Sequence, residues 1–190
     1  MRALLLLVPF LCLAAAPPSY TLTESEEAQL AKGKIAMRHQ PADTGGGVVA
    51  FAHVKAPPRK VLDEVMNLHA RVDENGAITS LDLYLEEKDP ERIGATWTLS
   101  VLGSKVVFHL LYDCHRDDGF CVYQLDPDKE SDLVSSEGHY IVQPRAEGTL
   151  LIYMSNTDTG RSMPGFLRRW IAGSSLNTQV EGIRERAEKP

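Results

Sequence analysis

Residues 105–125, KVVFHLLYDCHRDDGFCVYQL, decide the fold of this chain. Two runs of alternating residues flank an Asp-Asp-Gly turn at 117–119, and this pattern predicts a β-hairpin. We place Cys114 opposite Cys121. Tyr112 then faces Tyr123, and Leu110 faces Leu125. Because the apolar partners coincide in this register, we expect it to form and expect this face of the hairpin to be the inner one.

The two cysteines of the hairpin could bind a metal, act as a redox centre or form a disulfide. A structural metal site needs about four ligands, and alternation turns His115 away from Cys114. A redox centre usually has the Cys-x-x-Cys spacing, whereas six residues separate these two cysteines. A disulfide needs only facing positions and an oxidising compartment. We therefore predict a Cys114–Cys121 disulfide and no metal site.

The first residues, MRALLLLVPFLCLAAAPPS, have the layout of a secretory signal peptide. Arg2 precedes an apolar run that includes Cys12, and three alanines end it at residue 16. The run is shorter than the ~20 residues of a membrane span. We predict residues 1–16 to be a signal peptide, with the cut site left open because Pro17 follows. The protein is then periplasmic or secreted; an uncleaved anchor in the inner membrane is the alternative.

The net charge of the chain limits the kinds of partner that it can bind. The formal net charge of the 190 residues is −6, and loss of Arg2 makes it more negative. An acidic chain is a poor partner for nucleic acid and for an anionic membrane surface, but this charge does not oppose a neutral apolar ligand. We expect residues 17–47 to be an N-terminal extension and residues 48–188 to be one domain.

The N-terminal part alternates short helices with one strand. Thr23 and Glu26 have capping-box spacing, which predicts a helix to about Lys32. The segment HQPADTGGG, 39–47, is expected to be a loop, and its glycines are no phosphate cradle because a strand pattern follows at 48–55. Pro57-Pro58 can open a second helix, whose apolar stripe contains Val61, Leu62, Val65 and Leu68.

Period-two patterns dominate from residue 78 to residue 156. They predict strands near 78–87, 94–102, 105–115, 120–126, 137–144 and 148–156. A long amphipathic helix follows Pro164, with an apolar stripe made of Phe166, Leu167, Trp170, Ile171, Leu176, Val180 and Ile183. This order predicts an α+β fold in which a curved antiparallel sheet wraps around the C-terminal helix.

Five segments carry a resemblance to a known superfamily: VKAPPRKVLDEVMNL, VLGSKVVFHLLYDC, YQLDPDKESDL, EGHYIVQPRAEGTLLIYMSNTD and MPGFLRRW. Over 48–188 the chain resembles the helix-grip fold of the START-like (SRPBCC) superfamily, in particular bacterial polyketide cyclase-like and coenzyme Q-binding-like proteins. Other members are steroid and phospholipid transfer domains and birch-pollen-allergen-like proteins. The resemblance implies a short helical pair after the first strand and an apolar, aromatic cavity between the sheet and the long helix.

Alternation and the resemblance together suggest which residues line that cavity. They are Trp97, Leu99, Phe108, Leu110, Tyr112 and Tyr123 from the sheet, with Phe166 and Trp170 from the helix. The alternative is that these side chains only fill the core. The six histidines show no HExxH spacing, the sequence has no GxSxG motif, and His109 is expected on the outer face. We therefore predict no catalytic residue and no cofactor.

Three functions remain open. The first is an exported binding or transfer protein for a lipid, quinone, sterol or polyketide-like molecule, with transient membrane contact. The second is an enzyme of the polyketide cyclase or hydrolase type, which a buried His or Glu in the cavity with a strongly shifted pKa would favour. The third is an envelope interaction module without a ligand, which a cavity well below ~300 Å³ would favour. Ligand identity and oligomeric state stay open.

Overall fold

The computed structural model describes residues 17–41, 46–101, 103–160 and 165–190. The side chains at 41, 46, 101 and 165–175 are not described. The predicted signal peptide therefore lies outside the described residues. So do the side chains of Phe166, Leu167, Trp170 and Ile171, which were predicted on the long helix.

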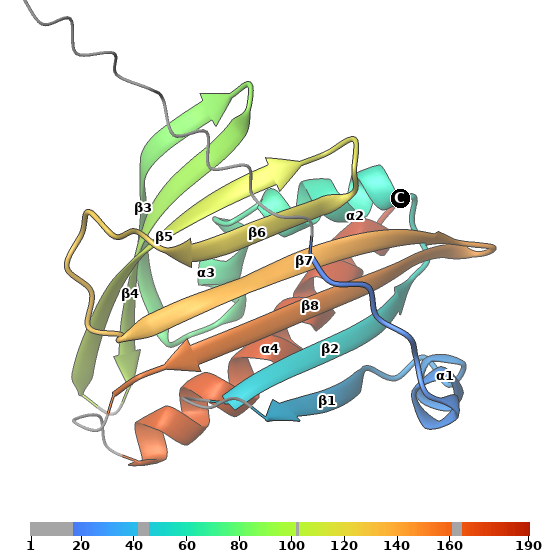
Figure 1. Cartoon of the computed structure of the whole chain (residues 1–190), viewed down its shortest axis with the longest axis horizontal. Helices are drawn as coiled ribbons and strands as arrows, with labels where there is room; N and C mark the ends of the chain where they lie inside the picture. Colours follow the sequence, from blue (N-terminus) through green and yellow to red (C-terminus); the bar gives the residue numbers. More distant parts are fainter. Residues whose placement is uncertain (1–16, 42–45, 102, 161–164) are drawn as a thin grey trace, which may run out of the picture.

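All eight described strands form one antiparallel sheet in the order β1-β2-β8-β7-β6-β5-β4-β3 (Figure 1). The strands are β1 Ala36–Pro41, β2 Gly46–Val54, β3 Ile78–Lys88, β4 Glu91–Val101, β5 Ser104–His115, β6 Phe120–Leu125, β7 Ser135–Arg145 and β8 Gly148–Asp158. Six of them follow one another as hairpins from β3 to β8. β2 pairs with β8, so the chain must cross the sheet between β2 and β3.

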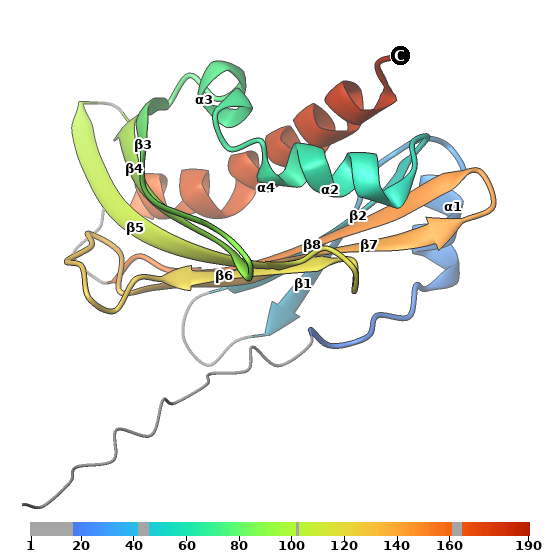
Figure 2. The ribbon, with the colours of Figure 1, turned by 90° about the horizontal axis from the view of Figure 1, so that it is seen from above.

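Two short helices make that crossing, and the long helix lies beside them. The two short helices are α2 Pro58–Met66 and α3 Ala70–Glu74, and the long helix is α4 Gly165–Glu188. A fourth helix, α1 Glu24–Leu30, precedes β1. Figure 2 shows α2, α3 and α4 on one side of the curved sheet and α1 apart from them; Figure 1 shows α1 next to the start of β1. Leu176, Val180, Ile183 and Ala187 of α4 are buried in the core at helical spacing. The α+β helix-grip arrangement is therefore confirmed.

The hairpin register predicted from the sequence is also confirmed. β5 and β6 pair Cys114 with Cys121, Tyr112 with Tyr123 and Leu110 with Leu125. The inner face of the sheet is the one predicted, because both Tyr112 and Tyr123 are buried in the core under the helices. His109 points to the opposite face, where its Nδ1 lies 2.9 Å from the hydroxyl oxygen of Thr96.

The prediction of a loop at 39–47 is wrong at both ends of the segment. Residues up to Pro41 belong to β1, and β2 already begins at Gly46. β1 is an edge strand that pairs only with β2. Its central residues, Arg38-His39-Gln40, are polar, and Met37 is exposed. The strand therefore lacks the apolar alternation by which a strand is recognised, and backbone pairing to β2 specifies it instead.

Part of the outer face of the sheet is covered by the N-terminal segment. Residues 17–23 cross in front of β7 and β8 to reach α1 (Figure 1). The ring of Tyr20 packs edge-on against Phe51 at 5.9 Å, and its hydroxyl lies 2.8 Å from Nε2 of His139. Leu30 of α1 joins a second apolar cluster with Val49, Phe51, Phe120, Ile141, Leu150 and Ile152. The sheet consequently buries apolar side chains on both faces.

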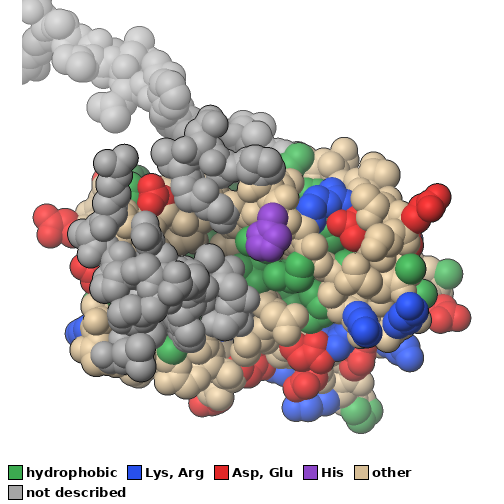
Figure 3. Space-filling model, turned by 90° about the horizontal axis from the view of Figure 1, so that it is seen from below, with side chains coloured by type: hydrophobic (Ala, Val, Ile, Leu, Met, Phe, Trp, Pro, Cys, Tyr) green, Lys and Arg blue, Asp and Glu red, His purple; other side chains and the backbone are tan. Residues whose placement is uncertain are grey.

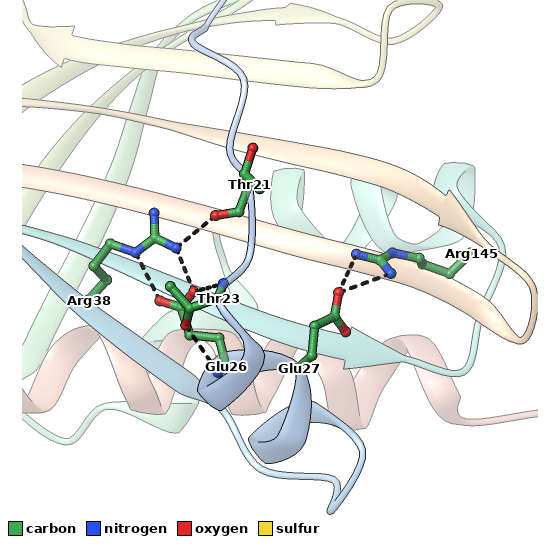
Figure 4. A network of polar contacts seen from close by, with 6 residues as sticks. All are labelled: Thr21, Thr23, Glu26, Glu27, Arg38 and Arg145. Carbon is green, nitrogen blue, oxygen red and sulfur yellow. Dashed lines mark hydrogen bonds and ion pairs between the residues drawn. The ribbon is translucent and has the colours of Figure 1, made fainter.

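Polar contacts hold α1 in place (Figure 4). The predicted capping box is present: Thr23 accepts a hydrogen bond from the Glu26 N–H, and the Glu26 carboxylate accepts one from the Thr23 N–H. Arg38 of β1 donates to both oxygens of the same carboxylate, at 2.8 and 2.5 Å. Figure 3 shows the molecule from below, and on this side Lys and Arg side chains lie among Asp and Glu side chains.

Candidate functional site

The candidate site is a cavity of about 90 Å³ between the inner face of the sheet and helices α3 and α4. All six sheet residues predicted for the cavity line it: Trp97, Leu99, Phe108, Leu110, Tyr112 and Tyr123. The remaining described lining consists of Arg71, Asn75, Ile78, Leu133, Ser136, Tyr140, Tyr153, Ser155, Thr157 and Gln179. The two helix residues predicted with them, Phe166 and Trp170, lie among the side chains that are not described.

Four tyrosines form the aromatic wall of the cavity. Tyr140 of β7 and Tyr153 of β8 are register partners, and their rings stack 4.2 Å apart and 10° from parallel. The rings of Tyr112 and Tyr123 lie 5.6 Å apart. Alternation does not single out Tyr153, because Leu150 to Met154 form an unbroken apolar run that is buried on both faces of the sheet.

The most unusual side chain of the site is Arg71 on α3, which is only 2% exposed. Its Nη2 donates a hydrogen bond of 2.6 Å to the carbonyl oxygen of Val65. The guanidinium carbon lies 5.3 Å from the ring centre of Tyr140 and 6.0 Å from those of Trp97 and Tyr112. Within the described part of the chain Arg71 has no carboxylate partner, and its Nε has no hydrogen bond. Arg71 is thus a buried cation without a counter-ion.

Burial of such a cation is unfavourable. The effective cost of burying one ion is several kcal/mol, roughly, before its partners are counted. One charged hydrogen bond contributes about 1.5–3 kcal/mol. The three ring contacts lie near the ~6 Å limit of useful cation–π attraction. The unpaired Nε adds a desolvation penalty of about 1–3 kcal/mol. The indole N–H of Trp97 is likewise buried without an acceptor.

Glu74, one helical turn after Arg71, is engaged elsewhere. Its Oε1 forms an ion pair with Arg186 of α4, and Arg186 also pairs with Glu64 of α2 at 2.7 Å. The Glu74 carboxylate lies against Gly182 of α4, where a Cβ would collide with it. This network joins α2, α3 and α4 and leaves Arg71 to face the tyrosines.

The charge states of the site follow from burial. Burial raises the pKa of Tyr112, Tyr123, Tyr140 and Tyr153, and Arg71 opposes this rise at Tyr112 and Tyr140. All four phenols are therefore neutral at physiological pH. Burial acts against the charge of Arg71, but a guanidinium does not lose its proton in a protein, so Arg71 stays a cation. Tyr112 lies beside Arg71 and Trp97. Its hydroxyl oxygen does not accept a well-formed hydrogen bond from Nε of Arg71 or from Nε1 of Trp97.

The cavity lining that the structure describes contains no histidine, aspartate or glutamate. The histidine whose pKa is strongly shifted is His139, which burial lowers to about 4. It lies on the outer face and contacts Tyr20, so it has no access to the cavity. Among the described residues, no three His, Cys, Asp or Glu side chains gather into a metal-binding group. The condition that would have favoured an enzyme is not met by these residues.

The two cysteines face each other at the buried inner face of the β5–β6 hairpin. Their Cα atoms are 4.1 Å apart, and the sulfur of Met66 lies 2.9 Å from Cys114 and 3.5 Å from Cys121. His115 points to the other face, where its ring stacks on Phe120 at 4.6 Å. The geometry therefore separates His115 from the cysteines, as alternation predicted.

Comparison with known proteins identifies the fold. No protein-family model matches the sequence, and no curated protein matches it. Among solved structures, TTHA0849 from Thermus thermophilus has a TM-score of 0.62 and 21% identity, covering 74% of this chain and 96% of its own. A STAR-related lipid transfer protein fragment from Xanthomonas axonopodis has a TM-score of 0.63 and 16% identity, covering 82% and 94%.

The Zhui aromatase/cyclase from Streptomyces sp. R1128 has a TM-score of 0.61 and 14% identity, with 80% of this chain and 94% of its own covered. These similarities, together with the sheet order and the position of α4, identify the START-like (SRPBCC) helix-grip fold. No helix in the described residues is long and apolar enough to cross a membrane.

Proposed function

We propose that the protein binds a compact, mainly hydrophobic small molecule in the cavity beneath α4. One observation carries this proposal: the cavity wall contains two buried donors without acceptors, Nε of Arg71 and Nε1 of Trp97. A core that only needs to be filled gains nothing from unpaired donors, because each costs about 1–3 kcal/mol. A ligand that accepts their hydrogen bonds removes this cost. Similarity to lipid transfer proteins and an aromatase/cyclase supports the proposal.

The volume of the cavity limits the ligand. About 90 Å³ is well below the ~300 Å³ at which typical ligand sites begin. The cavity as it stands accommodates only a small ring or a short chain. A sterol, quinone or phospholipid would have to push its walls apart. We therefore expect binding to be accompanied by an outward movement of the sheet or of α4.

The proposed compartment is the periplasm or the medium. The signal-peptide pattern of residues 1–16 supports export to the periplasm or the medium. In that oxidising compartment the facing positions of Cys114 and Cys121 support a disulfide. A protein that carries an apolar ligand there would load and unload it in transient contact with a membrane.

Titration with the neutral fluorescent probe N-phenyl-1-naphthylamine tests the proposal. Leu110→Trp places a large ring in the cavity, whereas Leu111→Trp, one residue along β5, points to the other face. We expect saturable binding to the wild type, at least tenfold weaker binding to Leu110→Trp and little change in Leu111→Trp. Native mass spectrometry of protein purified from its own membrane fraction should show a copurifying small molecule.

The small volume favours a second candidate, an interaction module with a packed interior. Under this alternative neither the wild type nor either variant binds the probe, and the native mass equals that of the bare chain. That combined result would exclude the ligand-binding proposal. Leu110→Trp is expected to remain folded, since overpacking costs about 1–3 kcal/mol, and circular dichroism of each variant checks this point.

A further inference from the structure

We infer that the ligand carries an acidic group and that Arg71 binds this group inside the cavity. The inference rests on the proposed function and names the chemical class of the ligand: a compact apolar or aromatic body with one anionic group, such as a carboxylate. The observation behind it is a permanent positive charge in the wall of an apolar cavity, with no negative charge among its described partners.

The protein itself does not supply the missing negative charge in its described part. On α3, Asp73 is exposed, and the Glu74 carboxylate pairs with Arg186 and packs against Gly182 of α4. The four tyrosines are neutral because burial raises the pKa of each. An arginine cannot relieve the mismatch by losing its proton. A bound anion is the remaining way to neutralise it.

The donors around Arg71 suit an oxyanion. Nε of Arg71 and Nε1 of Trp97 are both buried without a hydrogen-bond partner, and Tyr112 lies beside both residues. Planar guanidinium groups bind carboxylates through two parallel hydrogen bonds, one of which can come from Nε. No acidic side chain in the described lining would repel the anion. Phe108, Leu110 and Leu133 line the same cavity and would contact the apolar body.

Two probes with the same aromatic framework test the inference. 8-Anilinonaphthalene-1-sulfonate carries one anionic group, and N-phenyl-1-naphthylamine is the same molecule without it. We expect the wild type to bind the sulfonate at least tenfold more tightly than the neutral probe. Arg71→Met should weaken sulfonate binding at least tenfold more than it weakens neutral-probe binding. Arg71→Lys, which keeps the charge, should recover part of the loss.

A surface control separates the cavity from general cation binding. Lys105→Met removes an exposed cation from β5 and should leave both affinities unchanged. If the wild type binds both probes equally, or if Arg71→Met affects them equally, the acidic-ligand inference is wrong while the proposed function stands. If neither probe binds, both fail. The wild-type comparison needs no variant, so it decides the question even if Arg71→Met does not fold.

Discussion

The ring of Tyr123 lies directly over Gly138, the residue opposite it on β7. Because Gly138 has no side chain, Tyr123 reaches across β7 and donates a hydrogen bond of 2.9 Å to Ser155 on β8. Its hydroxyl also lies 3.3 Å from that of Tyr153. This crossing links three strands and builds the aromatic wall of the cavity.

Gly138→Ala should therefore damage the fold and the cavity together. The new Cβ would lie 2.5 Å from the Tyr123 ring and would also collide with the carbonyl oxygen of Met154. Since a backbone atom cannot rotate away, we expect a loss near the upper end of overpacking costs, about 3 kcal/mol. Urea denaturation measures it. Gly76→Ala is the control, because a Cβ there meets nothing within 4 Å; equal losses in the two variants would refute this interpretation.

Glu26 and Glu27 are neighbours on α1 with very different environments (Figure 4). The Glu26 side chain is 8% exposed and binds Arg38 and the helix cap, whereas that of Glu27 is 49% exposed and faces Arg145. We expect Glu26→Gln to lower the free energy of unfolding by about 1–3 kcal/mol. Glu27→Gln should change it by less than about 0.5 kcal/mol. Thermal denaturation of the two variants compares them, and a larger effect at Glu27 would contradict the prediction.

The stability of the protein should fall in mild acid because of His139. Burial lowers its pKa from 6.5 to about 4 in the folded protein, so the unfolded chain binds the proton more readily. The resulting stabilisation is complete above pH 6.5 and is lost as the pH falls toward 4. Its upper limit is about 3 kcal/mol. Denaturation measured between pH 7.5 and 4.5 tests this dependence.

His139→Gln is the control for the acid effect. Glutamine keeps a polar contact for Tyr20 but does not titrate, so the slope of stability between pH 6.5 and 4.5 should become flatter. Glu26 does not interfere in this window: its pKa is held at about 2, chiefly by the hydrogen bond from Arg38. Its contribution, present above pH 4.5, is lost only as the pH falls from there toward 2. An unchanged slope in the variant would assign the acid sensitivity to other groups.

The pairing of Cys114 with Cys121 predicts a disulfide if the protein is exported as proposed. Two residues that face each other across a hairpin close a short loop, and the chain-entropy model gives about 2–3 kcal/mol for such a bridge. Thiol titration of the unfolded, unreduced protein should find neither cysteine reactive. A reductant should lower the free energy of unfolding by the stated amount. Two free thiols in protein prepared from its native compartment would disprove the disulfide.

The sequence was most informative where alternation is strict. Cross-strand pairing at β5 and β6 indicated the register, the inner face and four residues of the cavity wall, and alternation along β4 indicated Trp97 and Leu99. Arg71 could not be found this way. It lies in a helix of five residues, ARVDE, whose polar composition is typical of a solvent-exposed turn. Its burial results from how α3 packs against β3 and α4, which a local pattern does not record. β1 was missed for a related reason, since an edge strand needs little apolar surface.

The N-terminal segment covers the outer face of only one half of the sheet, so the two halves differ in how easily they deform. β2, β7 and β8 are buried on both faces, between the helices and the segment that begins at residue 17. β3 has only one buried side, and Tyr84 and its acidic neighbours on that strand face solvent. A double-sided layer resists deformation, whereas a single-sided one can bend at lower cost. We therefore expect a ligand larger than the present cavity to bend the β3–β5 side of the sheet outward, while β2, β7 and β8 stay in place.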